Sequence, residues 1–185
     1  SGHPFGMVQE LTPEHDACVF VGYHARAGAG GNPLAHTLSS QRVFEVRLDD
    51  EPVSEYRIHA LAAASVGVPV VFVSGDETLC REVARVQPAT RTFATKWGEG
   101  ASQHSVHPEE ACDGIREGVR EALSGDRSAC RLEVPERLRL DVVFRSHAQA
   151  YARSFYPGAR QVDPHTVRLE TDDVFEVLRA LLFLV

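Results

Sequence analysis

The 185-residue sequence lacks the features of several large protein classes. It has a single lysine, Lys96, and 26 acidic against 19 basic residues, so it lacks the basic patch that nucleic acids or anionic membranes require. Its longest apolar runs, such as residues 68–73, are too short to cross a bilayer. We therefore expect no nucleic-acid partner and no membrane partner.

The cysteines also lack a pattern. Cys18, Cys80, Cys112 and Cys130 form neither a C-x-x-C pair nor a zinc-finger spacing. Scattered cysteines in a chain of this size are typical of free thiols in a reducing cytosol, and no signal peptide is visible. The sequence therefore predicts a cytoplasmic protein.

Nucleotide and serine-hydrolase motifs are missing as well. The glycine-rich run at residues 28–31 leads into Asn32 and Pro33, and it matches neither G-x-G-x-x-G nor the P-loop. No G-x-S-x-G is present. The sequence therefore gives little support to a nucleotide-binding protein or a serine hydrolase.

Apolar patterns along the chain alternate between strand and helix periods. The expected strands cover residues 17–24, 43–53 (a hairpin), 68–73, 89–95, 137–144 and 165–170. The expected helices cover residues 54–66, beginning at Ser54 and stopped by Gly67, and residues 77–86, 107–125, 148–155 and 173–184. Residues 96–106 are expected to form a loop. The alternation predicts an α/β fold with a sheet sandwiched by helices.

The length favours one domain. We divide it into two α/β halves, residues 1–97 with the candidate metal residues and residues 98–185, which can pack together as one domain.

Three residues form the main candidate site. His24 ends a predicted buried strand, at the edge where open α/β sheets usually hold ligands. His36 follows twelve residues later, across a glycine-rich loop, and Glu55 opens the next helix. Imidazole and carboxylate groups are donors that zinc prefers, so this set can hold a metal and position a base. Glu55 also has an ordinary explanation, because an acid in a first turn complements the helix dipole.

The other histidines are better explained by structure. His59 is four residues after Glu55 and shares its helix face, where a simple contact is favoured over shared metal binding. His107 lies near an N-cap position, so we expect a structural role for it and for its neighbour His104. His147 and His165 stand alone and are read as surface or packing residues. Lys96 can meet a substrate carboxylate or an oxyanion, or it can be solvated.

Several segments together resemble a known family. They are VFVGYHARAG, LAHT, PVSEYRIHALAAASVGVPVVFVSGD, ATKWGEG, FRSHAQAYARSFYPGA and the closing helix. They resemble peptidase family M55, the zinc-dependent D-aminopeptidases, over essentially the whole chain. The resemblance implies a layered α/β fold, two zinc ions, cleavage of short peptides with D-residues such as D-Ala-D-Ala, and a homodecameric ring.

The resemblance also implies roles for particular residues. The zinc-binding histidine of the family's GYHA motif falls on His24, and a glutamate ligand falls on Glu55. The proposed nucleophile or base falls on His36, and a lysine suited to substrate contact falls on Lys96. His59 falls where the family pattern requires no ligand.

One part of the family pattern is missing. The family begins with a strand carrying D-x-E, whose acids bind zinc, and a further histidine ligand follows it. The nearest candidates here, Glu10, Glu14, His15 and Asp16, stand in a different context. At most two family ligands are thus present, and two protein ligands rarely make a stable zinc site. We therefore expect an N-terminally incomplete part of a longer enzyme.

Two alternatives stay open. The missing D-x-E favours a non-catalytic binding or assembly module with this fold. An enzyme of the same fold that cleaves another amide is the second alternative.

Overall fold

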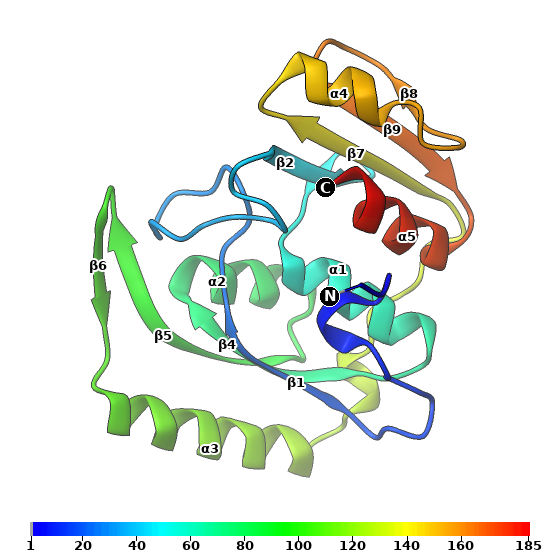
Figure 1. The fold of residues 1–185 in the computed structure, drawn as a ribbon. Helices are drawn as coiled ribbons and strands as arrows, with labels where there is room; N and C mark the ends of the chain where they lie inside the picture. The colour runs from blue at the N-terminus through cyan, green and yellow to red at the C-terminus, as the bar shows by residue number, and fades with distance from the viewer. Residues whose placement is uncertain (1) are drawn as a thin grey trace.

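The computed structural model describes residues 2–185 and shows an α/β protein with two sheets (Figure 1). Its strands are β1 (Cys18–Tyr23), β2 (Val43–Leu48), β3 (Glu51–Pro52), β4 (Val70–Asp76), β5 (Arg91–Glu99), β6 (Ser102–Ser105), β7 (Leu138–Phe144), β8 (Arg160–Gln161) and β9 (Thr166–Thr171). Its helices are α1 (Glu55–Ser65), α2 (Glu77–Val86), α3 (Pro108–Ser124), α4 (His147–Arg153) and α5 (Val174–Leu184). Short 3₁₀ turns lie at Gly6–Val8 and Ser128–Cys130.

The first sheet has the strand order β1-β4-β5-β6. β1, β4 and β5 are parallel, and β6 returns antiparallel to β5. Every residue of β4 is buried, because α1 and α2 pack on one face of the sheet and α3 packs on the other. The carboxyl ends of the three parallel strands therefore meet at one edge, the usual ligand-binding edge of such sheets.

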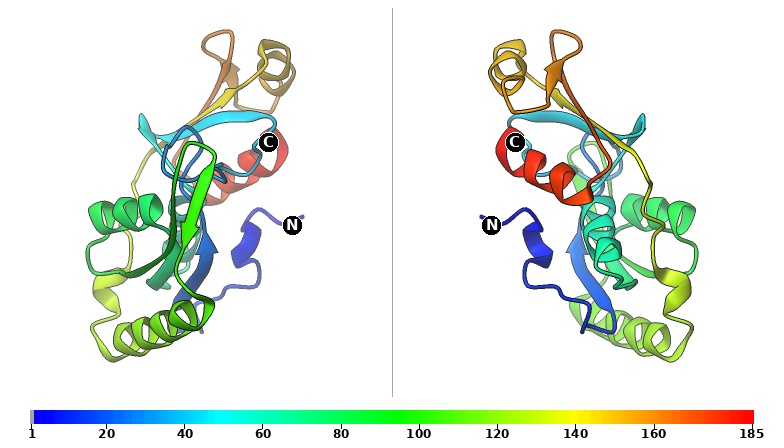
Figure 2. Two further views of the ribbon diagram at one scale, coloured as in Figure 1. Left: turned by 90° about the vertical axis from the view of Figure 1, so that its left-hand side faces the viewer. Right: turned by 90° about the vertical axis from the view of Figure 1, so that its right-hand side faces the viewer.

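The second sheet has the order β3-β2-β7-β9-β8 and is antiparallel throughout. Its core side chains pack against α1 and α5. Figure 2 shows this sheet with α4 and α5 at one end of the molecule and the first sheet with α3 at the other.

Helix α1 joins the two cores. Ile58 and Leu61 pack in the core of the second sheet, whereas Tyr56 and Ala60 pack in the core of the first. Small alanine side chains allow α1 to be buried on both sides. This placement holds Glu55, the first residue of α1, between the two sheets.

Most predicted elements are confirmed. The helix at residues 77–86 has the predicted bounds, and the helices at 54–66, 107–125 and 173–184 differ by one residue or so at their ends. The predicted strand at 68–73 continues through Asp76. Ser54 precedes α1 as predicted, but its hydroxyl donates to Glu82 Oε1 at 2.7 Å and does not cap the helix.

The prediction of a loop at residues 96–106 is wrong. β5 continues to Glu99, turns at Gly100, and pairs with β6. All four residues of β6 are exposed, so this strand has no apolar alternation for sequence reasoning to detect.

The predicted α/β class is confirmed, with two sheets in place of the single sheet that was expected. β2 belongs to the first half of the chain, yet it pairs with β7 of the second half. The division into residues 1–97 and 98–185 stays a prediction. All four cysteines are free thiols, as predicted. Among the helices of residues 2–185, none has the length and apolar character needed to cross a membrane.

Candidate active site

The three predicted residues lie close together. His24 directly follows β1, and its ring centroid is 5.5 Å from that of His36. The Nε2 atom of His36 is 3.5 Å from Oε1 of Glu55. The structure therefore brings together His24, His36 and Glu55 from the end of a strand, a loop and the start of a helix.

The hydrogen bonds of His36 define its tautomer. Its Nδ1 lies 2.7 Å from the carbonyl oxygen of Leu34. A carbonyl only accepts, so Nδ1 carries a proton, and Nε2 is the nitrogen that faces Glu55. In a neutral ring with this tautomer, Nε2 holds the lone pair. This arrangement suits a general base, because the lone pair is held in a fixed direction beside a carboxylate.

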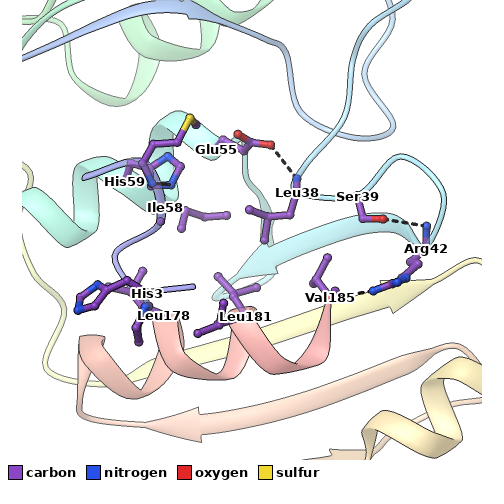
Figure 3. Close-up of a pocket in the computed structure, with 14 residues that line it drawn as sticks. His3, Leu38, Ser39, Arg42, Glu55, Ile58, His59, Leu178, Leu181 and Val185 are labelled. Atoms are coloured by element: carbon purple, nitrogen blue, oxygen red, sulfur yellow. Dashed lines mark hydrogen bonds between the residues drawn. The ribbon is translucent and has the colours of Figure 1, made fainter. Parts of the chain in front are cut away.

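Glu55 is held in turn by the backbone. Its Oε1 accepts the backbone N–H of Leu38 at 2.8 Å. Leu38 has φ +62°, a backbone conformation uncommon for a residue with a side chain. This turn of the chain directs the N–H of Leu38 toward the glutamate (Figure 3).

His24 has a buried nitrogen without a partner. Among residues 2–185, its Nδ1 has no hydrogen-bond partner. Burial lowers the pKa of His24, Lys96 and His36 lower it further, and Asp76 opposes them. Neutral imidazole is the form that binds metal. The lowered pKa of His24 favours this neutral form.

Lys96 belongs to the same edge. It lies on β5, in register with Asp76 on β4, and its charge acts on His24. The structure therefore brings the predicted substrate-contact residue to the histidine cluster.

Two hollows flank the cluster. One, of about 480 Å³, is lined by His24 and by residues 33–36 and 38–41, which include His36. The other, of about 490 Å³, is bordered by Glu55 and Arg42 and has apolar walls from α1 and α5 (Figure 3). Leu38 borders both hollows. The site therefore has space for a short peptide next to the His36–Glu55 pair.

The donor set for zinc is incomplete. Residues 2–185 contain no group of three or more His, Cys, Asp or Glu side chains placed to hold a metal ion. His24 and Glu55 are suitable donors by their chemistry, and the unpartnered Nδ1 of His24 is consistent with a ligand. Because a zinc site takes three or four protein ligands, the described residues fit part of one.

Sequence reasoning missed Asp76. The SGD segment reads as the end of a strand, but Asp76 is wholly buried and accepts three N–H bonds. An acidic residue at the carboxyl end of a buried parallel strand is the signal that could have identified it.

His59 lies in the core, as the structural explanation predicts. Its Nε2 accepts the backbone N–H of Met7 at 3.4 Å. Its Nδ1 then carries the proton and lies 3.2 Å from the hydroxyl of Tyr23. His59 thus fixes the N-terminal segment on α1 and is not part of the cluster.

The remaining histidines have structural contacts. His107 accepts a backbone N–H in the first turn of α3, so its predicted capping role is confirmed. His104 stacks on Trp97 with ring centroids 5.8 Å apart. His147 and His165 do not stand alone, because their rings are 6.3 Å apart.

The fold and the site together define a class of protein. It is an α/β protein in which His24, His36 and Glu55 gather near the edge where the parallel strands end. The chain belongs to the D-aminopeptidase family, peptidase family M55, whose sequence profile matches residues 1–183.

Two relatives agree with this assignment. The chain is 30% identical over 184 residues to a D-aminopeptidase of Bacillus subtilis (strain 168), covering 97% of this chain and 65% of the relative. It also superposes on the solved structure of DppA from Bacillus subtilis, described as a Zn-dependent D-aminopeptidase and a self-compartmentalizing protease. That match has a TM-score of 0.91 and 28% identity, and it covers 98% of this chain and 66% of DppA. The chain spans about two thirds of the length of these relatives.

Proposed function

We propose that the protein is a zinc-dependent aminopeptidase that cleaves short peptides with D-residues, of the D-Ala-D-Ala type. One observation carries the proposal. In a chain of the D-aminopeptidase family, Nε2 of His36 faces Glu55 beside the unpartnered nitrogen of His24. These groups lie next to a hollow of about 480 Å³.

His24 and Glu55 are the zinc ligands of this proposal, with two ions expected from the family resemblance. The further donors come from outside residues 2–185, in another segment of the protein or in another subunit. Bound zinc would supply Lewis acidity toward the scissile carbonyl.

His36 is the proposed base. Its Nε2 takes a proton from the attacking group, while Leu34 holds the ring through Nδ1. The carboxylate of Glu55, 3.5 Å away, then stabilises the imidazolium that forms. Lys96 is placed to bind the substrate carboxylate or the developing oxyanion.

Zinc content per chain tests the metal site. We expect near two zinc ions per chain by elemental mass spectrometry of the purified, zinc-loaded protein. A value near zero after incubation with excess zinc and washing contradicts the proposal. It would favour a non-catalytic binding or assembly module, which the incomplete donor set also favours.

A panel of substrates tests the remaining alternative, an enzyme of the same fold that cleaves another amide. D-dipeptides, L-dipeptides and simple amides are compared with the same zinc-loaded protein. We expect turnover of D-dipeptides. Turnover confined to simple amides would indicate a hydrolase of this fold that acts on another amide.

The proposal extends to assembly and location. A relative described as self-compartmentalizing supports self-association of this chain, and we propose a homodecameric ring that encloses the sites. The four free cysteines support a cytoplasmic location.

A further inference from the structure

We infer that Asp76 is a positioning residue that holds His24 and His36 in their working arrangement, an inference that rests on the proposed function. Asp76 ends β4 and has no exposed surface. It touches neither the flanking hollows nor the proposed substrate space. Its action on the site therefore passes through other residues.

The first route from Asp76 runs through Ala25. Oδ2 of Asp76 accepts the backbone N–H of Ala25 at 2.6 Å. Ala25 directly follows His24, and its own carbonyl accepts the backbone N–H of His36 at 3.1 Å. One buried residue, Ala25, held by one carboxylate oxygen, thus links the backbone positions of both histidines.

The second route runs through Asn32. The same Oδ2 accepts Nδ2 of Asn32 at 2.7 Å, and Oδ1 of Asn32 accepts the backbone N–H of Leu34 at 2.9 Å. The carbonyl of Leu34 accepts Nδ1–H of His36 at 2.7 Å. The tautomer of His36 therefore depends on a chain of hydrogen bonds that starts at Asp76.

The loop between the histidines needs such an anchor. Gly28 and Gly31 both have positive φ, and glycine-rich chain loses much conformational entropy when it is ordered. Asp76 binds the loop near its start, at Ala25, and again at Asn32. The glycine-rich stretch is thereby closed against the end of β4.

Helix capping alone does not explain Asp76. Its Oδ1 caps α2 by accepting the backbone N–H of Leu79 at 2.8 Å. Asp173 does the same for α5, where Oδ1 accepts from Phe175 at 2.8 Å, yet Asp173 is exposed. Capping needs one oxygen, whereas Asp76 is fully buried and uses its second oxygen for the loop.

Three variants separate positioning from stability. Asn32→Ala removes the Asn32 route and leaves the cap of α2 intact. Asp76→Asn sets an amide donor against the N–H groups of Ala25 and Asn32, or against that of Leu79 if it is flipped. Asp173→Asn is the matched control, because it makes the same change from carboxylate to amide in a helix cap away from the site.

Two readouts are measured on each zinc-loaded variant. The first is kcat and KM for D-Ala-D-Ala. We expect Asn32→Ala and Asp76→Asn to lower kcat about 10- to 100-fold, the usual effect of removing groups that orient metal-site residues, while Asp173→Asn leaves kcat unchanged. The second is the His36 tautomer, followed by nitrogen-15 NMR of the imidazole. We expect Nδ1–H in the wild type and a mixture with Nε2–H in Asn32→Ala.

The outcomes distinguish this inference from the proposed function. Wild-type kcat and a wild-type His36 tautomer in Asn32→Ala would overturn the inference, whether or not Asp76→Asn folds. A changed tautomer in a protein whose wild type cleaves no peptide would support the positioning role and overturn the proposed function.

Discussion

At the scale of single residues, the site depends on the direction of one lone pair. Nδ1–H of His36 is bound to a carbonyl, so its Nε2 is the nitrogen available as a base. We predict that His36→Ala lowers peptide hydrolysis by at least about 10²-fold, the usual contribution of general-base catalysis. Zinc content should stay at the wild-type value, because His36 is not a proposed ligand. Assays of D-Ala release and of zinc test this, and retained turnover would exclude the role.

Glu55 combines two proposed roles, as a ligand and as the carboxylate beside His36. We predict that Glu55→Gln weakens zinc binding, because a neutral amide is a poorer donor than a carboxylate. Zinc affinity is measured by competition with a chelator. Glu51→Gln is the control, because Glu51 is exposed and its substitution removes the same charge outside the cluster. Equal zinc affinity in Glu55→Gln and wild type would refute the ligand assignment.

Residue type and position pointed to His24 after a strand, His36 across the glycine-rich loop and Glu55 at the start of a helix, and the structure places the three close together. Asp76 also ends a buried strand, but its hydrogen bonds to Ala25 and Asn32 could not be read from the sequence. These contacts form because the ends of β1 and β4 lie side by side. The sequence pattern of a single segment does not encode such a contact between distant segments.

At the scale of elements, α1 and the N-terminal segment packed on it predict a pH dependence. Burial lowers the pKa of His59 from 6.5 to about 4. Between these values the unfolded chain binds more protons than the folded chain, so stability rises with pH in this window and falls on acidification. At about 1.4 kcal/mol per pH unit, the group accounts for about 3 kcal/mol lost between pH 6.5 and 4.

The substitution His59→Gln tests this assignment. It removes the titrating group, so the free energy of unfolding should vary less between pH 4 and 6.5 than it does in the wild type. The comparison uses denaturant unfolding at several pH values. The two curves of stability against pH would run parallel if His59 were not the cause.

Helix α3 packs closely on the first sheet through two glycines. A Cβ added at Gly118 would overlap the ring of Phe72, and one at Gly114 would overlap Phe93. We predict that Gly118→Ala destabilises the protein by about 1–3 kcal/mol, although alanine favours helix by about 1 kcal/mol. Cys112→Ala on the exposed face of α3 is the control, with an expected change within about 0.5 kcal/mol. Unfolding midpoints measure both, and a more stable Gly118→Ala would contradict the packing.

The elements that were predicted well have strong local patterns. α2 has an acidic N-cap, an apolar stripe and a stop before Pro88, and its bounds are as predicted. β6 is polar and exposed, so it owes its strand conformation to pairing with β5. The second sheet depends on β2 and β7, about a hundred residues apart in sequence, and no local period encodes such a pairing.

At the scale of the whole molecule, the two sheets leave the site between them. α1 packs in both cores, and its first residue is Glu55. Glu55 lies near the carboxyl edge of the first sheet, where His24 and Lys96 also lie. The sequence resemblance anticipated the family, which the matches to D-aminopeptidases confirm. Zinc binding and assembly stay proposals, because residues 2–185 hold no group of three or more side chains placed to bind a metal ion.

The most direct test of the account is the release of D-alanine from D-Ala-D-Ala by the zinc-loaded protein. The account predicts steady release that stops when a chelator removes zinc and resumes when zinc is restored. A protein that holds its zinc and still releases no D-alanine would contradict it.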